Sequence, residues 1–135
     1  MKSNQFSRSL RVALTGAALS CSASVAFADI RNYEFKLVEP TVKAGPDKAI
    51  TVKLVDKTTG KPVPDAVIFA TRLDMAPDGM QEMATKLTPV PETEPGIYRF
   101  KANFSMAGRW QLSLGAKVQG ETGTVENKLV IQADK

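Results

Sequence analysis

Residues 96–114 constrain the fold most, because apolar and polar side chains alternate along nearly their whole length. A period of two predicts a β-strand with one buried face and one solvent-facing face. We expect the chain to reverse at residues 105–108, so that two antiparallel strands form a hairpin whose apolar face other strands must cover. The apolar set is Tyr98, Phe100, Ala102, Phe104 and Met106 before the reversal, and Trp110, Leu112, Leu114 and Ala116 after it.

Five further segments alternate in the same way, and stretches rich in proline, glycine and aspartate separate them. These strands are predicted at about residues 32–37, 50–54, 67–75, 81–87 and 125–131. In the third of them, one buried face is expected to carry Val67, Phe69, Thr71, Leu73 and Met75. About seven short strands without a helical period predict an all-β protein, an immunoglobulin-like antiparallel sandwich. A small closed barrel is the alternative, because alternation does not distinguish closure from stacking.

The first 28 residues have the features of a secretory signal peptide. A basic start precedes a mostly apolar run at residues 12–19, and Ala26-Phe27-Ala28 matches a small-x-small cleavage site. Cleavage there would leave residues 29–135 as a single β-sandwich domain in the periplasm. An uncleaved membrane anchor is the alternative, but the apolar run is short for a bilayer span. Lipidation at Cys21 is a weaker alternative, because the residues before it fit the lipoprotein signal poorly.

Signal cleavage changes the charge of the chain. The mature protein keeps 15 of the 18 Lys and Arg residues against all 14 Asp and Glu residues, a net charge of +1. Nucleic acid and an anionic membrane surface are therefore not expected as partners, and no membrane span remains.

The mature chain also has neither cysteine nor histidine. The usual general base, the thiol nucleophile and the commonest ligands of divalent metals are thus absent, and we expect a protein that is not an enzyme. Hydrolysis by two facing carboxylates is a minor alternative. Its candidates, Asp74, Asp78 and Glu82, have the pattern of solvated loop charges.

Methionine is the remaining residue type with distinctive chemistry. Four methionines lie between the end of the strand at 67–75 and the reversal at 105–108, and they are Met75, Met80, Met83 and Met106. If consecutive strands alternate in direction, the two connections that carry them meet at one end of the sandwich. Thioether sulfurs are soft, neutral donors that suit monovalent copper and need no deprotonation, so a Cu(I) site that keeps its affinity in acid is predicted.

Core packing is the alternative role for these methionines. Met75 and Met106 carry the inward parity of their strands, whereas Met80 and Met83 have polar neighbours in the sequence, which favours a ligand role. Trp110 could lie over a bound cation or fill the core.

The pattern Gly96-x-Tyr98-x-Phe100, followed by Phe104-x-Met106-x-Gly108-x-Trp110-x-Leu112, resembles the YtkA-like and FixH-like family of exported β-sandwich domains. The loop at residues 75–83 and the turn at residues 60–66 belong to the same resemblance, which extends from about residue 44 to 131. It implies a periplasmic accessory protein for copper, either a metallochaperone or a factor in copper resistance or oxidase assembly. Several relatives have histidine among the loop methionines, so only a methionine site carries over to this chain.

Two functional hypotheses follow. In the first, a soluble periplasmic protein binds Cu(I) through Met75, Met80, Met83 and Met106 and exchanges it with a periplasmic or inner-membrane copper-handling protein. In the second, the chain is a non-catalytic envelope module that binds another protein without metal, through an edge strand or a loop face. Burial of three of the four sulfurs apart from one another would favour the second hypothesis.

Overall fold

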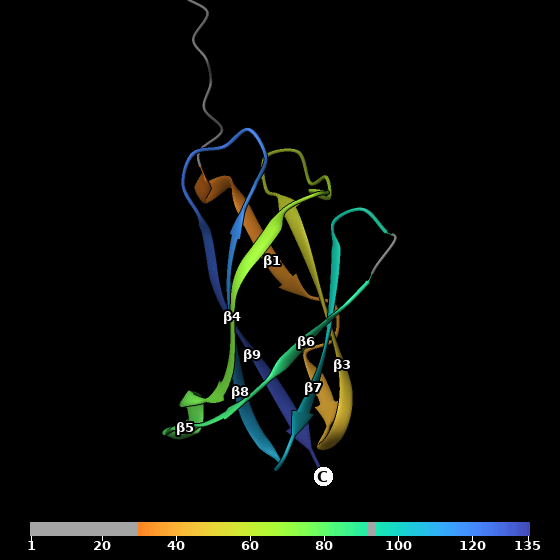
Figure 1. Cartoon of the computed structure of the whole chain (residues 1–135), viewed down its shortest axis with the longest axis vertical. Helices are drawn as coiled ribbons and strands as arrows, with labels where there is room; N and C mark the ends of the chain where they lie inside the picture. Colours follow the sequence, from red (N-terminus) through yellow and green to blue (C-terminus); the bar gives the residue numbers. More distant parts are fainter. Residues whose placement is uncertain (1–29, 92–93) are drawn as a thin grey trace, which may run out of the picture.

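The computed structural model describes residues 30–91 and 94–135, so the predicted signal peptide and its cleavage site lie outside the described residues. The described chain forms two stacked sheets with two short 3₁₀ helices, η1 (Ile30–Asn32) and η2 (Ala76–Asp78) (Figure 1). The first sheet has the order β1-β3-β7-β6 and consists of β1 (Tyr33–Leu37), β3 (Gly45–Asp56), β7 (Ile97–Phe104) and β6 (Leu87–Val90). The second has the order β2-β9-β8-β4-β5 and consists of β2 (Thr41–Lys43), β9 (Val125–Asp134), β8 (Gly108–Lys117), β4 (Val67–Met75) and β5 (Met80–Thr85).

Strand pairing within both sheets is antiparallel except between β2 and β9, which run parallel. The prediction of an all-β, immunoglobulin-like sandwich is confirmed, and the closed barrel is wrong because the strands divide into two separate sheets. The three-residue strand β2 and the division of residues 80–90 between β5 and β6 were not predicted. At Lys86 the chain passes from the second sheet to the first.

The core lies between the two sheets and is built from the inward parity of their strands. Phe104 of β7 and Trp110 of β8 contact each other edge to face across it, with ring centroids 5.4 Å apart. The largest fully buried side chains come from both sheets, and they are Trp110, Phe35, Phe104, Leu54, Leu73, Met75, Leu112, Ile131 and Val52. The alternation in the sequence therefore identified the buried faces of β7, β8 and β9 correctly.

The predicted hairpin at residues 96–114 is wrong. Strand β7 pairs with β3 and β6, whereas β8 pairs with β4 and β9, so the two consecutive strands lie in different sheets. Residues 105–107 carry the chain across the sandwich. The two apolar faces are buried because they meet each other through the core, as the contact between Phe104 and Trp110 shows.

The predicted buried face of β4 is wrong in its first half. The register shifts between Ile68 and Ala70, which is a β-bulge, and Val67 and Phe69 are 60% and 55% exposed. The extra residue at a bulge reverses the parity of the residues before it. Leu73 and Met75, which follow the bulge, are buried as predicted, whereas Thr71 is exposed.

Candidate functional site

Two connections that are distant in the sequence meet at one end of the sandwich, at the lower end of the molecule in Figure 1. The backbone N–H of Arg109 donates to Oδ2 of Asp78 at 2.8 Å, and Nε of Arg109 donates to Oδ1 at 2.9 Å. Nη2 of Arg109 also donates to the carbonyl oxygen of Pro77 at 2.8 Å. The predicted convergence of the two methionine-bearing connections is thus confirmed. We call residues 75–83 and 105–109 together the methionine end.

Gly108 marks the closest approach of the two connections. A Cβ atom at this position would lie 2.5 Å from Cε of Met75 and 2.7 Å from Oδ2 of Asp78. Gly108 also has a φ of 146°, in the region that favours glycine. The Met75 methyl group therefore reaches the β7–β8 connection because residue 108 has no side chain.

Met75 and Met80 are cross-strand partners on either side of η2. The register shifts between Asp74 and Met75, so this pair closes the turn around η2 and does not continue the regular ladder. Met75 is fully buried in the core, and Met80 is half-buried and packs against the core. The pairing places one buried and one accessible thioether side chain next to each other.

The other two methionines lie toward the outside of the methionine end. Met83 is half-buried and packs against the core from β5, in agreement with the strand predicted at about residues 81–87. Met106 is 40% exposed, and its predicted inward orientation is wrong because β7 already ends at Phe104. The carbonyl of Met106 accepts a hydrogen bond from Nε1 of Trp110 at 3.1 Å, which holds this connection against the core. Coordination of a metal by the four sulfurs stays a prediction.

Asp74 has a role that sequence reasoning missed. It is only 4% exposed, so the prediction of a solvated loop charge is wrong for this residue. Its carboxylate accepts from the backbone N–H of Ala76 at 2.9 Å and from Nε of Arg72 at 2.6 Å. Arg72 in turn donates through Nη2 to the carbonyl oxygen of Gln81 at 2.9 Å. Asp74 therefore fixes the start of η2, and an aspartate two residues before a turn is the sequence signal that points to this role.

Two charged groups of the methionine end, Asp78 and Arg109, already bind each other. The backbone N–H of Arg109 lowers the pKa of Asp78 most, and the guanidinium of Arg109 lowers it further. No cluster of three or more acidic side chains that could hold a metal ion occurs within residues 30–91 and 94–135, which contain neither histidine nor cysteine. The soft donors that this end offers to a metal are the neutral thioethers.

Comparison with known proteins gives a family match. A family model described as YtkA-like matches residues 27–115, a range that includes all four methionines. No curated protein sequence matches the chain. Among solved structures, the crystal structure of the Lin-41 filamin domain is similar, with a TM-score of 0.43 and 21% identity over 75% of this chain and 92% of that one. Within the described residues, no helix has the length and apolarity needed to cross a membrane.

Proposed function

The chain belongs to the YtkA-like family, and we propose that it is an exported accessory protein that binds monovalent copper through methionine thioethers. In this proposal it exchanges the ion with a protein of the periplasm or inner membrane. The observation that carries the proposal is the meeting of the β4–β5 and β7–β8 connections, tied together by Asp78 and Arg109. Met75, Met80 and Met106 lie on or next to these two connections, and Met83 lies further along β5.

The donor set fits this soft ion better than it fits hard divalent ions. Soft, neutral sulfur suits Cu(I), whereas hard divalent ions need the oxygen clusters that the described residues lack. Thioethers do not compete with protons, so the affinity of such a site is independent of pH in an acidic envelope compartment.

The four methionine side chains differ in burial, which suggests different roles for them in a metal site. Met75 is fully buried and contacts the backbone at Gly108, so it forms the fixed inner part of the site. Met106 exposes its side chain to solvent on a connection that Trp110 holds in place, so it is the ligand that a partner protein reaches first. Met80 and Met83 lie between these extremes of burial.

A competitive titration of the mature protein with Cu(I), under conditions that keep the metal reduced, tests the proposal. Met80→Leu and Met106→Leu each remove one sulfur and keep an apolar side chain of similar size. We expect each variant to lose at least about tenfold in affinity, which corresponds to about 1.4 kcal/mol. Phe69→Leu is the matched control, because it changes an exposed side chain on β4 away from the methionine end. Equal affinity in all four proteins would remove the proposal.

A further inference from the structure

One strand edge of the second sheet is open over more than half of its length. Strand β8 pairs with β4 from Val67 to Asp74, but β5 pairs with β4 only from Leu73 to Met75. Within the described part of the chain, no strand pairs with residues 67–72 on the side away from β8. Every second residue of such an edge turns its backbone N–H and C=O groups toward the unpaired side.

Three other strand edges of the sandwich, on β1, β5 and β6, have features that natural sheets commonly use to prevent pairing with another chain. On β1, the backbone N–H of Phe35 donates to Oδ1 of Asn127 of β9 at 2.9 Å. Strand β6 contains Pro89. In β5, the pairing with β4 is interrupted between Ala84, which pairs with Asp74, and Met80, which pairs with Met75. The open edge of β4 has a bulge and a charged residue at its end, Arg72, but residues 67–71 contain neither a charged side chain nor a proline.

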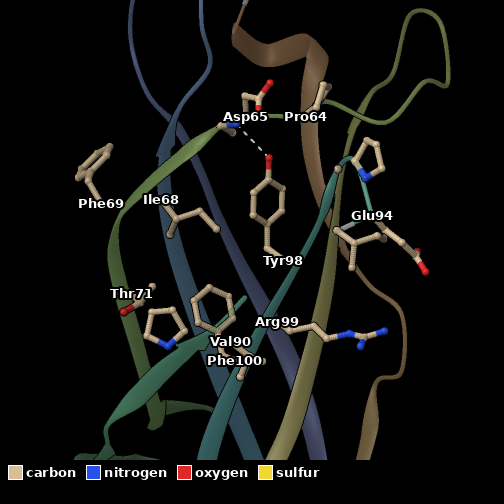
Figure 2. Close-up of a pocket in the computed structure, with 15 residues that line it drawn as sticks. Pro64, Asp65, Ile68, Phe69, Thr71, Val90, Glu94, Tyr98, Arg99 and Phe100 are labelled. Atoms are coloured by element: carbon tan, nitrogen blue, oxygen red, sulfur yellow. Dashed lines mark hydrogen bonds between the residues drawn. The ribbon is translucent and has the colours of Figure 1, made fainter. Parts of the chain in front are cut away.

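A groove with both polar and apolar lining runs beside this open edge, between the two sheets. Its volume is about 590 Å³, and Ile68 and Thr71 of β4 line one side. Val90 of β6 and Tyr98 and Phe100 of β7 line the other. Figure 2 shows Tyr98 in the middle of the groove, and Phe69 also lines it but directs its ring outward.

The hydroxyl of Tyr98 is fully occupied, so the floor of the groove is fixed. It accepts a hydrogen bond from the backbone N–H of Ala66 at 3.0 Å and donates one to the carbonyl oxygen of Val63 at 2.9 Å. The groove therefore exists before anything binds, and it lies where an added strand would place its inward side chains.

We propose that an extended segment of a partner protein adds to the open edge of β4 and inserts alternate apolar side chains into the groove. Six residues of open edge correspond to about 20 Å of strand, so a segment of about five or six residues directs about three side chains inward. Backbone hydrogen bonds to β4 supply affinity, and the groove selects side chains at every second position.

The occupant is a flexible segment of another protein and not a strand of a second copy. Side chains that face inward from a folded strand of this chain are committed to its own core, as Phe35 of β1 is. Such a strand cannot also fill a neighbour's groove. At the rim, the exposed carboxylate of Asp65 pairs with no cation among the described residues. The segment therefore carries a lysine or arginine at the end that lies next to Asp65.

Selection from a random peptide library on the purified, metal-free protein tests this inference. We expect enriched peptides to alternate apolar and polar residues and to carry a basic residue at one end. Ile68→Glu, which places a charge in the groove, should weaken binding of a synthetic enriched peptide at least about tenfold. Val67→Glu is the matched control, because Val67 is the preceding residue of β4, is 60% exposed and does not line the groove.

Val90→Glu gives a second test from the opposite wall of the groove, in case Ile68→Glu impairs folding. The inference is overturned if no alternating peptide is enriched, or if the enriched peptides bind equally to wild type and to the folded groove variants. Self-association in sedimentation experiments that the same variants abolish would also overturn it, in favour of a second copy as occupant. Metal is absent throughout, so these outcomes are independent of the copper proposal.

Discussion

Replacing Gly108 with alanine tests the packing at the methionine end, because it adds one methyl group where two side chains already lie. The new Cβ would be 2.5 Å from Cε of Met75 and 2.7 Å from Oδ2 of Asp78. Met75 is fully buried, so its methyl group has no solvent to move into. The Asp78 oxygen accepts from the backbone N–H of Arg109 at 2.8 Å and cannot move without lengthening that bond.

The expected cost has two parts. An alanine at the φ of 146° observed for Gly108 is strained by about 1–3 kcal/mol. Overpacking of a well-filled site by one methyl group costs about 1–3 kcal/mol more. We therefore expect Gly108→Ala to lower the free energy of unfolding by about 2–6 kcal/mol, a large part of the total for a small domain.

Urea unfolding, followed by the fluorescence of the single tryptophan, Trp110, measures this cost. Gly79→Ala is the control, because Gly79 has a φ of 75° but a Cβ there would meet no atom within 4 Å. It reports the backbone strain alone, about 1 kcal/mol. If Gly108→Ala destabilises the protein no more than Gly79→Ala does, then the two connections are not packed together as described.

Two further predictions concern the same end. Met75→Ala should lower the free energy of unfolding in urea by about 2–5 kcal/mol, and Met75→Leu by less than about 1.5 kcal/mol. Both variants should lose the same amount of Cu(I) affinity, because both lack the sulfur. If the loss of affinity follows the loss of stability instead, Met75 only packs in the core. Arg109 lowers the pKa of Asp78 below its ordinary 3.8, so the charged carboxylate stabilises the fold above that value. This contribution disappears as pH falls through the lowered pKa, and the urea midpoint of wild type should drop more steeply between about pH 5 and pH 2 than that of Asp78→Asn. Parallel curves for the two proteins would contradict the role of this pair.

The sequence was most informative about the faces of individual strands. Burial at alternate positions of β7, β8 and β9 follows from the period of their apolar residues, and the structure confirms it. Which strands lie side by side could not be predicted in the same way. Alternation describes the two faces of one strand and not its neighbours, so the pairing of residues 96–114 as a hairpin was wrong.

The candidate site was predicted in part. The alternating direction of consecutive strands is enough to bring the connections at η2 and at residues 105–107 to the same end, as observed. The exposure of Met106 depends on where β7 ends, and the burial of Asp74 depends on its bonds to Ala76 and Arg72. The bulge near Phe69 leaves no period in the sequence, and the open edge of β4 depends on how far β5 pairs with it, so both became visible only in the structure.

X-ray absorption spectroscopy of the Cu(I)-loaded protein tests the copper proposal most directly, because it identifies the atoms bound to the metal. The account predicts a first shell of sulfur alone, from at least three thioethers, and the same spectrum at neutral and acidic pH. A shell of nitrogen or oxygen, or an unchanged spectrum when Met75, Met80, Met83 and Met106 are all replaced by leucine, would contradict it.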